Sequence, residues 1–224
     1  MKGAYVINLE PYEIHDFTMN ISCNWECVEL LIRCVRFYLI HSSARLTRVS
    51  TENKTLINSP HIKIEIIPTP RLYIYVSSNK YISIVFPFNI KLDGDNITLW
   101  YNDVMVNEKI ISEIITLLHM RQNSLSSVGA SKNTLFELYV SNDEYEPISD
   151  NAFYVTENLL QSEYGYIRHD YDPRSANGKI HPEYHMDINF SKYATFKYGT
   201  ERMLSNVEFE FTFDKNKECL YLRE

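Results

Sequence analysis

Ionisable side chains gather in one short stretch of this chain, residues 164–190, which reads YGYIRHDYDPRSANGKIHPEYHMDINF. It holds three histidines, four acidic residues and two arginines. Histidine exchanges protons near neutral pH, carboxylates and imidazoles bind divalent metal ions, and arginine holds phosphate groups with its planar fork. We therefore look for a functional site in this stretch first.

Polar and apolar residues alternate on both sides of a central loop, which is typical of two half-buried strands. In the first run the ionisable face carries Arg168, Asp170 and Asp172. In the second run it carries His181, Glu183, His185 and Asp187. The loop between them contains Pro173 and an Asn-Gly pair, which favours a hairpin turn.

We expect the two strands to pair antiparallel with Asp170 near Glu183, which brings Arg168 near His185. A slip of one residue would turn one strand's polar set into the core, so the hydrophobic pattern disfavours it. All seven of these ionisable residues are then expected on one surface.

Three uses of that surface follow from the residue types. A divalent ion could be held by one histidine together with Asp170, Glu183 or Asp187, because two histidines four apart in a strand are too distant for a tight chelate. Alternatively, His185 could act as general base or acid, with His181 as its partner. The third interpretation is a solvated, charged sheet face with no chemical role. Each pair of opposite charges on it then contributes less than about 1 kcal/mol to folding stability.

In the acid–base hypothesis, Asp170 and Asp187 orient the imidazole or bind a metal, and Arg168 stabilises the charge that develops on a phosphate. The candidate catalytic residues are therefore His185, His181, Asp170, Arg168 and Asp187. The sequence specifies neither a metal nor another cofactor.

The elements around this hairpin indicate an α+β fold with twisted, largely antiparallel sheet built from meanders and hairpins. Strands are expected at residues 4–9, 62–66, 72–76, 81–88, 97–101, 135–140, 193–197, 207–213 and 218–222. Those between 62 and 101 are joined so closely that they predict one antiparallel meander. We expect two main helices packed on the sheet, over residues 25–41 with Asn24 as N-cap and from Asn107 to 122. A shorter third helix is expected to start at Ser149 or Asp150 and to reach Leu160.

A single domain over residues 1–224 is expected, with a subdomain break in the Ser-rich segment 123–133 as the alternative. The formal net charge of −7 argues against a general duplex-binding surface, although nucleic acid is retained as a candidate substrate. The four cysteines lack a CxxC spacing and are expected to be free thiols in a reducing cytoplasm. We expect no membrane partner, although a short membrane anchor is an alternative interpretation of the helix at 25–41.

The motif of Arg168, Asp170 and Tyr171 followed by His181-Pro182, His185 and Asp187 resembles the core of uncharacterised bacterial families. Genes of those families often lie in mobile elements and in phage-defence or toxin–antitoxin neighbourhoods. The chain departs from them after Ile188, where a Pro-containing run and a final helix would follow and this sequence predicts a strand. The resemblance implies an antiviral defence or toxin role, and nucleic-acid cleavage as its chemistry.

Two functions are consistent with these observations. One is an interaction or regulatory component of a defence system, whose acidic, tyrosine-rich surface binds a protein partner. The other is a small phosphodiesterase or nuclease-like hydrolase that uses the hairpin cluster. The sequence lacks a Gly-rich phosphate loop, a GxSxG elbow and an HExxH helix, which removes the common nucleotide-hydrolysing and serine-hydrolase readings.

Overall fold

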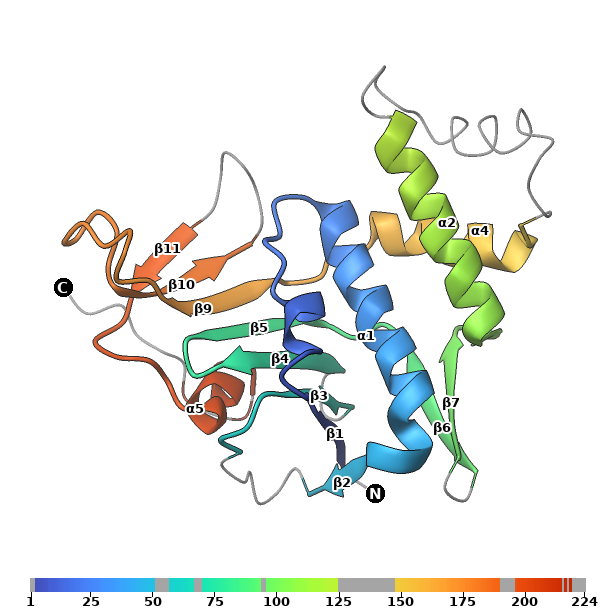
Figure 1. The fold of residues 1–224 in the computed structure, drawn as a ribbon, viewed down its shortest axis with the longest axis horizontal. Helices are drawn as coiled ribbons and strands as arrows, with labels where there is room; N and C mark the ends of the chain where they lie inside the picture. The colour runs from blue at the N-terminus through green and yellow to red at the C-terminus, as the bar shows by residue number, and fades with distance from the viewer. Residues whose placement is uncertain are drawn as a thin grey trace. The chain divides into compact units, whose positions relative to one another are not determined.

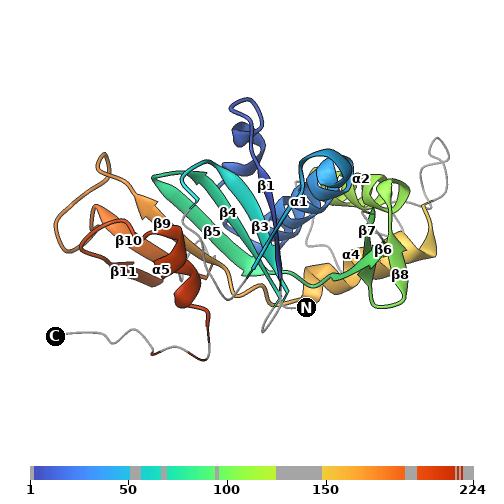
Figure 2. The same cartoon turned by 90° about the horizontal axis from the view of Figure 1, so that it is seen from below.

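The computed structural model describes residues 3–50, 57–66, 70–93, 96–124, 148–189 and 196–214, together with 216 and 218. In these residues it contains four α-helices and two antiparallel sheets, which confirms the predicted α+β class (Figures 1 and 2). The larger sheet has eight strands in the order β11-β10-β9-β5-β4-β3-β1-β2, and the smaller has the order β6-β7-β8.

The larger sheet places the 164–190 hairpin beside the central strands of the fold. Its strands are β1 (Ala4–Asn8), β2 (Thr47–Val49), β3 (His61–Glu65), β4 (Arg71–Ser77), β5 (Lys80–Val85), β9 (Ile167–Tyr171), β10 (Tyr184–Ile188) and β11 (Phe196–Gly199). β5 pairs directly with β9 although the two are far apart in sequence, and β11 lies at the edge. Side chains of each strand alternate between the two faces of this sheet. One face carries buried isoleucines of β3, β4 and β5, and the polar residues of the hairpin continue the same face.

The expected single meander is wrong, because the chain leaves the larger sheet after β5. The next strands, β6 (Asn89–Asp93), β7 (Asn96–Tyr101) and β8 (Val104–Val106), form the separate three-stranded sheet. Pro87 lies at the break, and proline has no backbone N–H with which to continue a ladder. The flanking Phe86 and Phe88 are both buried.

The longer helices are α1 (Asn24–Arg45), α2 (Glu108–Ser124) and α4 (Asp150–Gln161). Asn107 caps α2 as expected, since its Oδ1 accepts from Ile110 N. The expected start of the third helix is Ser149 or Asp150, and in the structure Asp150 is its first residue while Ser149 caps it, with Oγ accepting from Ala152 N. Asn24, however, is the first residue of α1 rather than its cap, and its side-chain amide donates to the carbonyl of Leu160 at the end of α4.

The predicted strand at 207–213 is wrong, because this segment forms the helix α5 (Asn206–Phe211). Ser205 and Glu208 make a reciprocal capping box, in which each side chain accepts from the other residue's backbone N–H. Phe209 then packs between Tyr73 and Tyr75 of β4, where its side chain is fully buried. Capping and docking together outweigh the two-residue alternation of this segment.

The chain divides into two compact units, each built from separated segments. The first comprises Met1–Ser22, Arg45–Phe86 and Tyr164–Glu224, and so contains the larger sheet and α5. The second comprises Cys23–Ala44 and Pro87–Glu163, with nearly all of α1, the smaller sheet, α2 and α4. Most of the expected break at 123–133, the expected strand at 135–140, and the expected strand at 218–222 apart from residue 218 lie outside the described residues.

In the described part of the chain, no helix combines the length and the apolar character needed to cross a membrane. Cys23, Cys27 and Cys34 are free thiols, as expected, and burial raises the pKa of each of them above its ordinary value. Cys219 lies outside the described residues.

Candidate active site

The hairpin forms as expected, but its register differs from the expected one by two residues. β9 and β10 pair antiparallel with Asp170 opposite His185 and Arg168 opposite Asp187. Glu183 instead lies opposite Asp172, and the backbone N–H of Asp172 donates to the backbone carbonyl of Glu183. A shift of two leaves every side chain on its predicted face, because strand side chains alternate with a period of two.

The neighbouring strands bring two lysines to the same face. Lys80 of β5 lies opposite Asp170, and Lys197 of β11 lies opposite Asp187. We use the term ionic cluster for the resulting set of six residues: Lys80, Arg168, Asp170, His185, Asp187 and Lys197. Neither lysine can be predicted from the sequence, because alternation identifies a residue's face but not the strand that will lie beside it.

Arg168 connects the two carboxylates of the ionic cluster. Its Nε lies 2.5 Å from Asp170 Oδ2, and its Nη2 donates to Asp187 Oδ2 at 2.5 Å. The other oxygen of Asp187, Oδ1, accepts from Lys197 Nζ at 2.6 Å. The Asp187 side chain is only 3% exposed, and a carboxylate buried to that degree requires such compensation.

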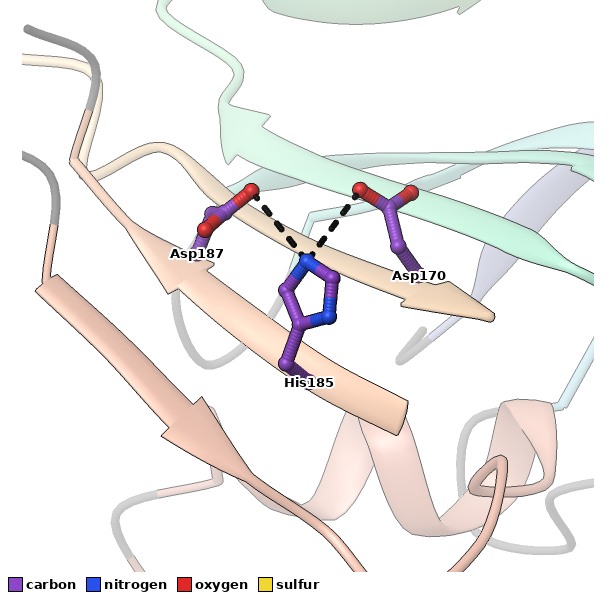
Figure 3. A group of neighbouring side chains, drawn as sticks. All are labelled: Asp170, His185 and Asp187. Carbon is purple, nitrogen blue, oxygen red and sulfur yellow. Dashed lines mark ion pairs between the residues drawn. The ribbon is translucent and has the colours of Figure 1, made fainter. Parts of the chain in front are cut away.

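His185 is the most buried ionisable side chain of the ionic cluster, at 2% exposure. Its Nδ1 lies 2.9 Å from the carbonyl oxygen of Pro182, and because a carbonyl only accepts, Nδ1 carries the proton. In the neutral ring Nε2 then has a lone pair, and it points between Asp170 and Asp187 (Figure 3). Nε2 lies 4.0 Å from Asp170 Oδ2 and 3.8 Å from Asp187 Oδ2, beyond hydrogen-bonding distance.

The other hairpin residues considered from the sequence lie outside the ionic cluster. His181 follows the turn, where its ring contacts that of His185 edge to face with the centroids 4.7 Å apart. Glu183 is exposed. Hydrogen bonds from the Ser175 side chain and from Ser175 N to the Asp172 carboxylate lower the pKa of Asp172. Of the seven residues expected on one surface, four converge: Arg168, Asp170, His185 and Asp187.

His169 lies on the opposite face of the same strand, as its place in the alternation predicts. Its ring is fully buried against Phe209, and Nε2 lies 3.0 Å from Thr200 Oγ1. Burial lowers the pKa of His169 to about 4, and the neighbouring His185 contributes to a smaller extent. His169 is therefore neutral at pH 7 and acts as a packing residue.

Asp170, His185 and Asp187 are also placed to hold a metal ion. One ligand atom from each lies within 4.8 Å of the others. One imidazole nitrogen with two carboxylate oxygens suits divalent ions such as Mn²⁺ or Zn²⁺. The carbonyl that fixes Nδ1 is the usual outer partner of a metal-binding histidine.

A cavity of about 390 Å³ lies on the opposite face of the sheet. It is lined by Tyr75, Tyr81 and the start of α5, together with uncharged residues, both polar and apolar, of the neighbouring segments. None of the ionic-cluster residues lines it. The cavity and the ionic cluster are therefore two separate sites on opposite faces of the sheet.

A scan against protein-family models finds no match, and neither does a search of curated proteins or of solved structures. The function is therefore argued from the chemistry of the ionic cluster, and the resemblance of the hairpin motif to defence-associated families stays a prediction.

Proposed function

We propose that the protein hydrolyses phosphodiester bonds, with the ionic cluster as its active site. The observation that carries this proposal is the direction of His185 Nε2, which points at two carboxylates on the same sheet face that holds Arg168. Groups that accept a proton from water then lie beside a group that holds phosphate, as hydrolysis of a phosphodiester requires.

The balance of charge in the ionic cluster favours an anionic substrate. Three basic residues, Lys80, Arg168 and Lys197, share this sheet face with two carboxylates, which leaves one positive charge in excess when His185 is neutral. Arg168 and Lys197 pair with the carboxylates, whereas Lys80 Nζ donates to neighbouring loop oxygens. A local positive site on a chain with a net charge of −7 favours recognition of one phosphate group rather than of a whole duplex.

The hydrolysis divides the residues into two sides. On the acceptor side, formed by His185 Nε2 with Asp170 and Asp187, the attacking water loses its proton. The water oxygen bonds to phosphorus, the ester P–O bond breaks, and the leaving oxygen takes up a proton. Arg168 stabilises the charge on the phosphoryl oxygens during this step.

Purified protein tests the proposal directly. We expect it to cleave bis(p-nitrophenyl) phosphate or single-stranded oligonucleotides when divalent cations are supplied. His185→Gln is expected to lower the rate by about 100-fold or more, in line with loss of a proton-transfer or metal-binding group. His119→Ala, at an exposed position on α2, is the matched control and should leave the rate unchanged.

Folding of His185→Gln is checked by circular dichroism. Equal cleavage by the wild type and folded His185→Gln would mean that the activity arises elsewhere, and no cleavage by the wild type would reject the proposal.

A second candidate function is an interaction or regulatory component of a defence or toxin–antitoxin system. The observation that favours it is Phe196, which is 62% exposed on the edge strand β11. An exposed aromatic residue beside unpaired edge groups is typical of a strand that pairs with another chain.

This second function predicts a stoichiometric partner that co-purifies with the chain, without turnover of phosphodiesters. Phe196→Ser should lower that recovery, whereas Tyr12→Ser, at another exposed aromatic position, should not. Equal recovery with both variants would show that β11 is not the contact.

A further inference from the structure

We infer that Asp170, His185 and Asp187 bind a divalent cation in exchange for the Arg168 guanidinium. This inference rests on the proposed function, because it assigns the acceptor side of the ionic cluster to a metal whose bound water loses its proton readily. It also names Arg168 as the residue that the metal releases toward the phosphate.

The first support is the convergence of His185 Nε2 and two carboxylate oxygens on one point. The His185 side chain is only 2% exposed. Its Nε2 points between two carboxylate oxygens without reaching hydrogen-bonding distance to either. A nitrogen lone pair that faces two negatively charged oxygens is stabilised when a cation lies between them. The three ligand atoms are already close enough to share one ion.

The second support is the way in which the imidazole is held. Pro182 supplies the carbonyl oxygen that accepts from His185 Nδ1, and its ring packs against Gly199, which lies opposite His185 on β11. A Cβ at position 199 would lie 2.9 Å from Pro182 Cγ, so glycine permits this close approach. The backbone of β11 therefore fixes the ring with Nε2 toward the carboxylates.

Arg168 is the competitor, because it uses the same atoms that the cation would use. Its Nε and Nη2 contact Asp170 Oδ2 and Asp187 Oδ2, and these are the oxygens nearest His185 Nε2. A divalent ion on those oxygens repels the guanidinium, so the two occupy the site alternately. Lys197 binds Oδ1 of Asp187 and can stay in place.

The exchange has a consequence for a phosphodiester substrate. Arg168, held between two carboxylates, has its charge neutralised and its fork occupied. Once a metal ion takes those oxygens, the guanidinium is released next to the ion, where it can bind a phosphate in bidentate geometry. Metal and substrate then bind cooperatively.

Mn²⁺ binding to the full-length protein, followed by electron paramagnetic resonance and calorimetry, tests the exchange. We expect one site in the wild type. Asp170→Asn and His185→Gln should each weaken binding by about tenfold or more. Arg168→Gln should strengthen it by about fivefold or more, because the competing charge is gone. Glu183→Gln, an exposed acid of the same hairpin, is the matched control and should bind as the wild type does.

The Arg168→Gln result separates this inference from a purely structural cluster. If Arg168 only held the carboxylates in place, its removal would weaken Mn²⁺ binding, and that result would overturn the exchange. Lys197→Gln, at a side chain that is 34% exposed, gives a second reading in case Arg168→Gln does not fold. It should bind Mn²⁺ at least as tightly as the wild type, and weaker binding would likewise contradict the inference.

Failure of this inference can be told apart from failure of the proposed function. Mn²⁺ binding with the expected variant pattern but without cleavage would reject the hydrolase and leave the metal site standing. Cleavage that persists in EDTA, with neither Mn²⁺ nor Zn²⁺ bound, would reject the metal site and leave the hydrolase standing.

Discussion

Arg168 and Asp187 lie directly opposite each other on β9 and β10, and Arg168 Nη2 donates to Asp187 Oδ2 at 2.5 Å. Asp187 also accepts from Lys197 on the next strand, so one carboxylate joins three strands of the sheet. Because Asp187 is almost fully buried and both cations are partly exposed, its charge is the one that the fold most needs to keep compensated.

Asp187→Ala is expected to destabilise the first unit by about 3 kcal/mol, because it leaves Arg168 and Lys197 close together without their shared partner. Urea unfolding followed by circular dichroism measures the change. Glu183→Gln on the same hairpin is the control and should shift the unfolding free energy by less than about 0.5 kcal/mol. A loss below 1 kcal/mol for Asp187→Ala would show that solvent already screens the cluster.

His169 predicts a loss of stability in mild acid. Its pKa is lowered to about 4 in the folded state from an ordinary value of 6.5, so the unfolded chain binds the proton more readily. Stability should therefore fall as the pH drops from about 6.5 towards 4, by up to roughly 3 kcal/mol. Melting temperatures measured across this range in the wild type and in His169→Leu test the assignment, since the variant should lose that part of the pH dependence.

Glu208 predicts a second transition at lower pH. Hydrogen bonds from Arg202 and from the Ser205 backbone lower its pKa to about 2 from an ordinary value of 4.5. Its contribution is complete above about pH 4.5 and is lost as the pH falls towards 2. At pH 7, Glu208→Ala should destabilise α5 by about 1 kcal/mol, as loss of a capping box does. Denaturant unfolding measures this loss, and an unchanged midpoint would mean that docking of Phe209 alone holds the helix.

Gly199→Ala should displace Pro182 and release the His185 ring. The added Cβ would lie 2.9 Å from Pro182 Cγ. Such overpacking typically lowers the free energy of unfolding by about 1–3 kcal/mol. We expect a lower melting temperature and, if the cation exchange holds, weaker Mn²⁺ binding. Gly3→Ala is the control, because its Cβ would make only ordinary van der Waals contacts, 3.4 Å from Arg48 Nε and 3.8 Å from the carbonyl oxygen of Val49. Unchanged stability and Mn²⁺ affinity in Gly199→Ala would show that Pro182 does not position the imidazole.

The secondary structure could be predicted where local signals agree. The sequence predicts Asn107 as a cap, because its side chain can satisfy a backbone donor three residues along the chain. α5 could not be predicted from alternation alone, since residues 207–213 fit a strand and only the capping box at Ser205 points to a helix. The contact of Phe209 with Tyr73 and Tyr75, which depends on the whole sheet, stabilises the helical form.

The sequence by itself determined that Arg168, Asp170, His185 and Asp187 share one face. Side-chain direction along a strand is a local property of the backbone, so it can be read from residue parity. Only the tertiary structure decided the register, the inward aim of His185 Nε2 and the addition of Lys80 and Lys197. These depend on which strands become neighbours, and long-range pairing and packing of the whole sheet determine that choice.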